Sequence, residues 1–301
     1  MNSFKNKITI GITAYKEGEY LLEAWNSVLK QTDNSWEAIM VLDGGADVKT
    51  KRIFNNISHP SLRKIKLGEN NGPYYCRTLA IKKTETDWYC HLDADDLLPE
   101  NMVNNINATI EKYSDIQFII GNCIYFDKKY FNVKFHKGLN DSKLAYTLPF
   151  NGQSPIKCEL FNQVGGYNES FYRGGADWDF WLKVLEADKK GKIIDDIIYE
   201  RRYRKNNVGS NWVSKRHNMV KQLIDYHPKY FSEDDKKNIC YSKSYEFAAR
   251  EKRSIGQRKE AAKLAQKALN FGNKNPNLNA IIVEFEMPLW RYKLRRIARM
   301  F

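Results

Sequence analysis

Apolar residues follow two alternating periods through the first half of the chain. Short apolar, mostly β-branched runs predict strands at Lys7–Thr13, Glu37–Leu42, Arg63–Leu67, Asp87–Leu92 and Phe118–Phe126. Apolar positions at helical spacing predict helices between them, over Glu17–Gln31, Tyr74–Lys83 and Pro99–Tyr113. Strands that alternate with helices predict an α/β fold with a mostly parallel central sheet flanked by helices.

The pattern changes in the second half of the chain. Residues 127–147 are mixed and give no assignment, and a helix over Asp177–Ala187 and a strand over Lys192–Tyr199 follow. Beyond about Asn211 the period is helical throughout. Tyr245–Arg253 and Arg258–Phe271 predict an αα-hairpin that turns around Gly256, and a single helix pair does not indicate a repeat array.

Charge divides the chain at the same place as the period. Residues 1–210 carry 29 Lys and Arg against 27 Asp and Glu, whereas residues 211–301 carry 20 against 9, out of a net charge of +13. We therefore expect two domains, an α/β domain over 1–210 and a basic α-helical C-terminal extension over 211–301. A basic appendage on a neutral body predicts an anionic partner.

Composition excludes several classes of protein. With 42% hydrophobic and 28% charged residues, the 301-residue chain is neither collagen-like nor disordered nor a multi-span membrane protein. The polar start of the chain resembles no signal peptide, which predicts a cytoplasmic location. Five cysteines without C-x-x-C spacing are expected to be reduced thiols rather than zinc ligands.

In a parallel sheet, ligands bind beyond the carboxyl ends of the strands. The segments at those ends are Thr13–Glu17, Asp43–Asp47 and Asp93–Asp96. The last segment holds three carboxylates in four residues, and a divalent cation with oxygen ligands would compensate their repulsion. The alternative is a solvated acidic turn that caps the next helix, and the position after an apolar strand favours the metal.

Three further residues have both a functional and a structural interpretation. Asp43, before two glycines, is able to bind a base or ribose, or to accept bonds from its own turn. Arg77 is able to pair with a phosphate or with a carboxylate such as Asp93, or to form a surface ion pair. Asp177 suits a general base, or an N-terminal charge on its helix.

Six motifs occur in one order along the chain. They are Thr13-Ala14-Tyr15, Asp43-Gly44, Asn71-Gly72 to Arg77, Asp93-Ala94-Asp95-Asp96, Val164-Gly165-Gly166-Tyr167-Asn168-Glu169 and Asp177-Trp178-Asp179-Phe180-Trp181-Leu182. Each is weak alone, but the ordered set resembles the nucleotide-sugar glycosyltransferases of family 2. The resemblance covers about residues 7–205 and implies the A-type glycosyltransferase fold.

The resemblance implies a nucleotide site at the first strands. Thr13, Ala14 and Tyr15 would lie against the nucleotide, and Asp43 would hydrogen-bond its base. Arg77 would lie near the nucleotide and the acidic motif.

The resemblance also implies roles for the carboxylates. Asp93 would contact the ribose and the metal, with Ala94 beside it at the nucleotide, and Asp95 would be the direct ligand of a Mn²⁺ or Mg²⁺ that bridges the diphosphate. Asp177 would be the general base on the acceptor hydroxyl, and the transfer would invert the anomeric carbon.

Two positions depart from the family pattern. Ala176 stands where the family has a Glu before the base, and Asn206 stands where many relatives have a His that contacts the metal or diphosphate. We expect Asn206 to act as a weaker metal ligand through its carbonyl oxygen, or Arg204 and Lys205 to take part of the diphosphate charge. His217 is a further substitute, with a structural role as the commoner alternative.

The last twelve residues, 290–301, predict a basic amphipathic helix. Trp290, Leu294, Ile297 and Phe301 share one face, and five Lys and Arg residues surround it. Such a helix suits an anionic membrane surface, and docking on the protein body is the equal alternative.

These observations favour an inverting glycosyltransferase of surface polysaccharide synthesis. It would move a sugar from a nucleotide-sugar donor, UDP being the commonest nucleotide in the family, to a glycan or a lipid-linked glycan, peripheral to the inner membrane face. The alternatives are a catalytically inactive member of the fold that binds at an anionic surface, a nucleotidyltransferase and a nucleic-acid-binding protein. The chain has no Gly-rich basic loop after the first strand, which a nucleotidyltransferase would need. It also has no nucleic-acid recognition module, so no nucleic-acid partner is expected.

Overall fold

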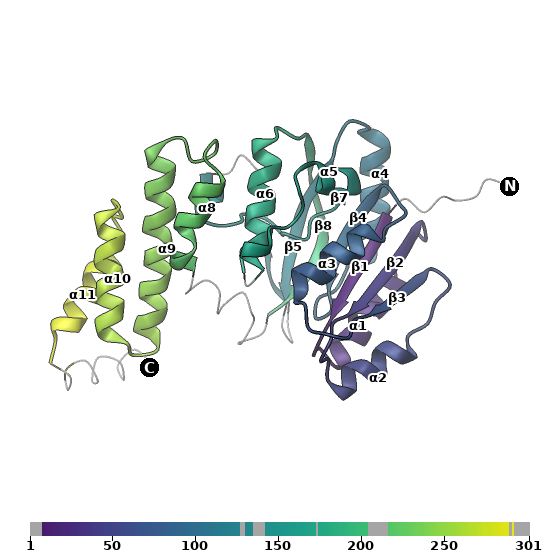
Figure 1. Cartoon of the computed structure of the whole chain (residues 1–301), viewed down its shortest axis with the longest axis horizontal. Helices are drawn as coiled ribbons and strands as arrows, with labels where there is room; N and C mark the ends of the chain where they lie inside the picture. The colour runs from purple at the N-terminus through teal and green to yellow at the C-terminus, as the bar shows by residue number, and fades with distance from the viewer. Residues whose placement is uncertain are drawn as a thin grey trace. The chain divides into compact units, whose positions relative to one another are not determined.

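The computed structural model describes residues 8–126, 130–134, 142–172, 174–203, 216–288 and 291. The chain forms two compact units (Figure 1). The first comprises residues 1–141 and 148–205, and the second comprises residues 142–147 and 206–301. The boundary expected at 210/211 falls within residues 204–215, which lie outside the described part of the chain.

The first unit is built on a sheet of eight described strands. Their bounds are β1 Ile8–Ala14, β2 Trp36–Leu42, β3 Leu62–Lys66, β4 Trp88–Asp93, β5 Phe118–Phe126, β6 Tyr130–Lys134, β7 Ile156–Lys157 and β8 Gly191–Arg202. The order is β3-β2-β1-β4-β7-β5-β6, and β8 pairs with β5. Strands β1 to β4 pair in parallel among themselves, and β5 pairs in parallel with β8. Strand β7 pairs antiparallel with β4 and β5, and β6 pairs antiparallel with β5. The predicted mostly parallel sheet is confirmed.

Helices surround this sheet in the same unit. They are α1 Glu19–Leu29, α2 Val48–Asn56, α3 Pro73–Lys82, α4 Met102–Lys112, α5 Cys158–Gln163 and α6 Ala176–Glu186. The sequence predicted α1, α3, α4 and α6. The prediction that Pro99 opens α4 is wrong, because the helix begins at Met102. Pro99 precedes it in a turn in which the Met102 amide donates to the Pro99 carbonyl, 3.0 Å away.

Strand β1 is covered on both faces of the sheet. Ile8, Ile10 and Ile12 are fully buried in the core on one face of the sheet. The opposite face of β1 is also covered, and at Gly11 an added Cβ would lie 2.0 Å from the Tyr89 hydroxyl oxygen. This face of β1 carries Thr9, Gly11 and Thr13. The buried Thr9 hydroxyl is hydrogen-bonded to the Thr86 hydroxyl at 2.7 Å, and glycine at position 11 makes room for the Tyr89 ring on β4.

The second unit is helical. Its described helices are α8 Val220–Tyr226, α9 Asp234–Ser254, α10 Arg258–Asn270 and α11 Pro276–Glu286 (Figure 1). Small residues of α9 and α10 pack closely in its core with Leu264, Leu278 and Ile281. The predicted αα-hairpin is present, and Gly256 turns the chain between α9 and α10 at a φ of 81°.

Two buried glutamates connect α9 with α11 and with the segment that precedes α11. Glu246 on α9 accepts hydrogen bonds from the Asn273 and Asn275 side chains at 2.9 and 2.6 Å. Glu284 on α11 forms a two-pronged ion pair with Arg253, with N–O distances of 2.7 and 2.6 Å. Searched over the described residues, the chain has no helix with the length and apolar character to cross a membrane.

Candidate active site

The three segments expected at the site lie at one edge of the sheet. Thr13 is paired with Asp93 across β1 and β4, so the ends of these strands are neighbours. The Asp43 amide donates to the Ala14 carbonyl at 2.8 Å, which brings the end of β2 to the same edge. The acidic turn follows directly, closed by a 2.9 Å bond from the Asp96 amide to the Asp93 carbonyl. The topology therefore brings the three predicted segments together.

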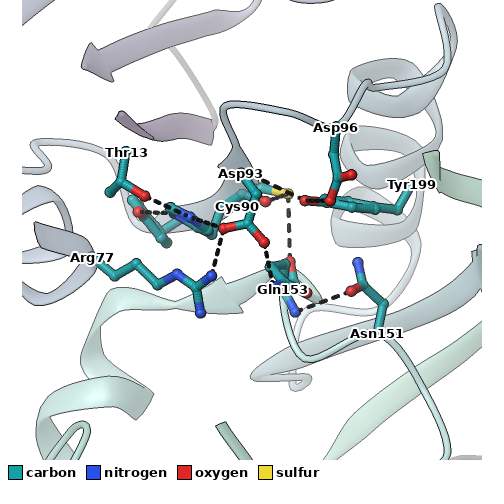
Figure 2. Close-up of polar contacts among 10 residues, drawn as sticks. Thr13, Arg77, Cys90, Asp93, Asp96, Asn151, Gln153 and Tyr199 are labelled. Carbon is teal, nitrogen blue, oxygen red and sulfur yellow. Dashed lines mark hydrogen bonds and ion pairs between the residues drawn. The ribbon is translucent and has the colours of Figure 1, made fainter. Parts of the chain in front are cut away.

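Asp93 is the centre of a polar network (Figure 2). Its Oδ1 accepts from Arg77 Nη2 at 2.5 Å and from His91 Nε2 at 3.0 Å, and its Oδ2 accepts from Gln153 Nε2 at 2.9 Å. Burial opposes ionisation of Asp93, but the Arg77 guanidinium and the His91 hydrogen bond outweigh it and hold the pKa of Asp93 well below its usual range. Arg77 thus pairs with a carboxylate, one of its two predicted functional partners.

His91 belongs to this network and was not singled out from the sequence. Burial first, and then the nearby Arg77 charge, lower the pKa of His91 to about 4, so its ring is neutral at pH 7. Asp93 is ionised and only accepts, so Nε2 carries the ring proton, and Nδ1 accepts from the Tyr89 hydroxyl at 3.0 Å. The available signal was its position two residues before Asp93, on the same face of a strand.

Asp96 is held from the end of β8. The Tyr199 hydroxyl donates to Asp96 Oδ2 at 3.0 Å and accepts from the Asp93 amide at 3.1 Å. The Arg202 amide donates to Asp96 Oδ1 at 2.7 Å, and Arg202 Nε donates to the Asp95 carbonyl at 2.9 Å. Burial and the charges of Asp93 and Asp95 raise the pKa of Asp96 to about 8. The sequence pointed to neither Tyr199 nor Arg202.

These contacts distinguish the three carboxylates of the acidic turn. Donors of the protein occupy oxygens of Asp93 and Asp96, and Asp95, the third carboxylate of the turn, is half-buried. Among the described residues, no group of three or more His, Cys, Asp or Glu side chains is arranged to hold a metal. Mg²⁺-type ions are commonly bound by one or two carboxylates together with substrate phosphates, so this donor set fits such an ion. Asn206, the other predicted ligand, lies outside the described residues.

Asp43 organises the loop before α3. Its Oδ1 accepts from the amides of Gly44 and Asn71, each at 2.9 Å, and its Oδ2 accepts from the Gly72 amide at 2.9 Å. Asp43 is buried, and these bonds lead the chain into α3, which carries Arg77. Asp43 therefore accepts hydrogen bonds from its own turn, as the structural alternative expected, and its contact with a base stays a prediction.

The other predicted nucleotide contacts differ in exposure. Thr13 and Tyr15 are half-buried, and Thr13 Oγ1 lies 3.3 Å from His91 Nε2. Ala14 and Ala94 are buried in the apolar core. Their methyl groups therefore face the interior, and a contact of either residue with a nucleotide would come from its backbone.

Asp177 is the more accessible carboxylate at the start of α6. It is half-buried, its Oδ1 accepts from the Trp178 amide at 2.9 Å, and its Oδ2 lies beside Gly152, where an added Cβ would be 3.0 Å away. Asp179 is fully buried and pairs with Lys183 at 2.8 Å. Of the two acidic residues in this motif, only Asp177 is partly exposed, and its role as the base stays a prediction.

The aromatic residues of α6 are structural. Trp181 is fully buried, and its Nε1 donates to the Gly152 carbonyl at 3.2 Å. Trp178 is also buried. Ala176 is buried at the position where the family has a Glu.

Comparison with known proteins tests the resemblance drawn from the six motifs. The profile described as Glycosyl transferase family 2 matches residues 9–175, more than half of the chain. The chain therefore belongs to glycosyl transferase family 2 and is a glycosyltransferase. The resemblance drawn from the six motifs is confirmed.

Three similar proteins illustrate the relationship. An uncharacterized glycosyltransferase of Methanocaldococcus jannaschii is 24% identical over 247 residues, which cover 78% of this chain and 82% of the relative. A teichoic acid poly(glycerol phosphate) polymerase of Staphylococcus epidermidis is 32% identical over 117 residues, 38% of this chain and only 16% of the polymerase. The crystal structure of S. aureus TarS 1-349 in complex with UDP-GlcNAc matches with a TM-score of 0.68 at 15% identity, over 92% of this chain and 84% of that chain. This structural likeness supports the A-type fold.

Proposed function

We propose that this glycosyltransferase transfers a sugar from a UDP-sugar to a hydroxyl of a surface polysaccharide or of its lipid-linked precursor, with inversion at the anomeric carbon. The observation that carries the proposal is the placement of the acidic turn, the Arg77–Asp93 pair and Asp177 in one compact unit. Support for the substrate class comes from the staphylococcal relative, named for teichoic acid, and from the fold shared with a UDP-GlcNAc complex.

The donor nucleotide lies at the carboxyl ends of β1, β2 and β4 in this proposal. Thr13, Ala14 and Tyr15 line it, and Asp43 holds the Asn71–Gly72 loop near its base. The buried Arg77 charge fixes Asp93, which keeps the acidic turn in one conformation. A rigid donor site lowers the entropy that binding would otherwise cost.

Asp95 is the proposed ligand of a Mn²⁺ or Mg²⁺, with Asp93 and Asn206 beside it. Such an ion supplies positive charge to the diphosphate as it leaves. Asp93 also accepts from Arg77, His91 and Gln153, so it orients the turn as well as contributing charge.

Asp177 is the proposed general base. Its carboxylate takes the proton of the acceptor hydroxyl while that oxygen forms a bond to the anomeric carbon, and the bond from this carbon to the diphosphate oxygen breaks. The electron pair of the broken bond leaves with the diphosphate. A single displacement of this kind inverts the anomeric configuration.

We also propose that residues 290–301 attach the enzyme to an anionic leaflet on the cytoplasmic side. Support comes from the five basic residues and the shared apolar face in the sequence. This segment lies outside the described residues, apart from Arg291.

The donor site is tested by thermal stabilisation with a nucleotide panel. We expect UDP with Mn²⁺ to raise the melting temperature of the wild type and Asp95→Ala to abolish the effect. A ligand at 100 times its Kd adds about 2.7 kcal/mol of stability. Asp115→Ala, which removes an exposed carboxylate paired with Lys190, is the matched control and should retain the response. No stabilisation by any nucleotide with metal would contradict the proposal.

A further inference from the structure

One tight turn touches both proposed reaction carboxylates. The turn comprises Asn151 to Ser154 and is closed by bonds from the Ser154 amide and hydroxyl to the Asn151 carbonyl, at 3.1 and 2.7 Å. On one side, Gln153 Nε2 donates to Asp93 Oδ2 at 2.9 Å. On the other side, Gly152 lies against Asp177 Oδ2. Adjacent residues of this turn thus contact the donor side and the base side of the site.

The turn is fixed to the elements that carry these carboxylates. The Gly152 carbonyl accepts from Trp181 Nε1 on α6, the helix that begins with Asp177. The Gln153 carbonyl lies 3.8 Å from the Cys90 sulfur on β4, the strand that ends in Asp93. The turn is therefore held by contacts with both elements.

The chemistry of the neighbours fixes the orientation of both amide side chains. Asp93 is an ionised acceptor, so Gln153 must present its NH₂ group to it and turn Oε1 elsewhere. Asn151 Oδ1 accepts from the backbone amide of Gln153 at 3.5 Å, so Asn151 Nδ2 points the other way (Figure 2). The arrangement leaves one donor group on Asn151 and one acceptor atom on Gln153 for other partners.

Neither of these two atoms has a partner within the described structure. Asn151 Nδ2 and Gln153 Oε1 are buried without a hydrogen bond, and the two residues are only 4% and 6% exposed. A buried polar atom without a partner is costly, so native proteins retain one chiefly where another group satisfies it. Sugar hydroxyls both donate and accept hydrogen bonds, so they supply partners for an unpaired donor and for an unpaired acceptor.

We infer that Asn151 and Gln153 bind a hydroxyl of the sugar that is transferred. This inference rests on the proposed function. In a single displacement the anomeric carbon lies between the leaving diphosphate and the attacking oxygen, and therefore between the acidic turn and Asp177. The 151–154 turn contacts both, so the sugar ring lies over it. Because both atoms are covered, neighbouring side chains must shift when the sugar enters, as side chains at binding sites commonly do.

The test compares UDP with UDP-glucose, UDP-galactose and UDP-GlcNAc by calorimetry, with Mn²⁺, in the wild type and in Asn151→Leu. Leucine has a similar size and removes the unpaired donor. We expect the wild type to prefer one UDP-sugar to UDP, and the variant to lose about 2- to 10-fold in affinity for that sugar nucleotide while its affinity for UDP is unchanged. The melting temperature of the variant without ligand should stay close to that of the wild type, because removal of a buried unpaired group offsets loss of the 3.5 Å bond from the Gln153 backbone amide to Asn151 Oδ1.

Asn122→Leu is the matched control. Asn122 is equally buried, but its Nδ2 donates to the Asp195 carbonyl at 2.6 Å. This variant should lose stability and keep the preference between UDP and UDP-sugars.

Three results would overturn the inference: Asn151→Leu destabilises the protein and leaves the preference intact, it weakens UDP and UDP-sugar equally, or the wild type binds UDP and all three UDP-sugars alike. Absence of UDP binding in the wild type would instead contradict the proposed function itself.

Discussion

At the scale of single residues, the site depends on charges that are buried together. The Arg77 and Asp93 side chains are 9% and 20% exposed and lie 2.5 Å apart. Desolvation makes each charge costly on its own, and the partner compensates for it. Their pairing keeps Asp93 ionised beside Asp96, whose own pKa is raised.

Removal of Arg77 alone should therefore strongly destabilise the folded state. We expect Arg77→Met to lower the free energy of unfolding by about 3–5 kcal/mol, because it leaves Asp93 buried without its counter-charge. The double variant Arg77→Met with Asp93→Asn should lose less than the sum of the two single losses. Urea unfolding followed by tryptophan fluorescence measures both, and additive losses would show that the pair is not coupled.

Asp96 gives a dependence on pH. Its pKa is raised to about 8, above the ordinary value of 3.8, so the folded state holds this proton more tightly than the unfolded state. The resulting stability is complete below about pH 4 and is lost as pH rises through 8. Asp96→Asn mimics the protonated form and should be more stable than the wild type at pH 9 in EDTA, with a smaller advantage at pH 6. An equal difference in melting temperature at both pH values would contradict this prediction.

The sequence predicted some of these residues and not others. Arg77, Asp93, Asp95 and Asp177 stand in motifs whose residue types and positions indicate their chemistry. Residues such as Gln153 and Tyr199 carry no local signal, because their partner Asp93 lies 60 and 106 positions away in the chain. Their importance comes from the way β7 and β8 join the sheet, which no local pattern encodes.

At the scale of elements, the site is a meeting of strand ends with one helix start. The strands β1, β2 and β4 present Thr13, Asp43 and Asp93 at one edge, and α6 presents Asp177. The Asn151–Ser154 turn contacts both parts of this arrangement. The position of Asp177 therefore depends on the close approach of Gly152.

Substitution of Gly152 should displace the base. A Cβ there would lie 3.0 Å from Asp177 Oδ2 and 3.1 Å from Leu148 Cδ2, so these side chains must shift by a few tenths of an ångström. We expect Gly152→Ala to lower kcat for hydrolysis of a UDP-sugar at least tenfold while UDP binding is retained. Gly68→Ala, at a position where an added Cβ meets nothing within 4 Å, is the control and should leave kcat unchanged. An unchanged kcat in Gly152→Ala would show that the contact does not position Asp177.

The elements were predictable where burial imposes a pattern. Strand β5 matches its predicted range, Phe118–Phe126, because it is covered by apolar neighbours for most of its length. Helix α2 was missed, because Ile53 and Phe54 are its only large buried side chains and give no clear helical period. The helix begins after the N-cap residue Asp47, whose carboxylate accepts from the Thr50 amide at 2.7 Å. Strand β7 has only two residues, too few for any period.

At the scale of the whole molecule, the two units differ in net charge. The body is nearly neutral and the last 91 residues are strongly basic, as the sequence alone establishes. The α/β body followed by helices was predictable from the change of period. Residues 142–147 lie within the sequence of the body but belong to the helical unit. This assignment was not predictable from the sequence, because it depends on tertiary contacts alone.

The basic end of the chain predicts binding to membranes. We expect the full chain to sediment with phosphatidylserine-containing vesicles at low salt and to be released at high salt, since each basic residue near such a surface contributes about 1 kcal/mol. Replacement of Lys293, Arg295, Arg296 and Arg299 by Gln should weaken this binding at least tenfold. Equal sedimentation with neutral vesicles would show that charge does not drive attachment.

The most direct measurement is the turnover of the UDP-sugar that the binding panel selects, compared between the wild type and Asp177→Asn. The asparagine keeps the shape of the residue and removes its capacity to take a proton. We predict that donor affinity is unchanged and that the rate of UDP release falls about 10²- to 10⁴-fold, the usual contribution of a general base. Unchanged turnover in this variant, with an intact donor affinity, would contradict the assignment of Asp177 and the proposed reaction.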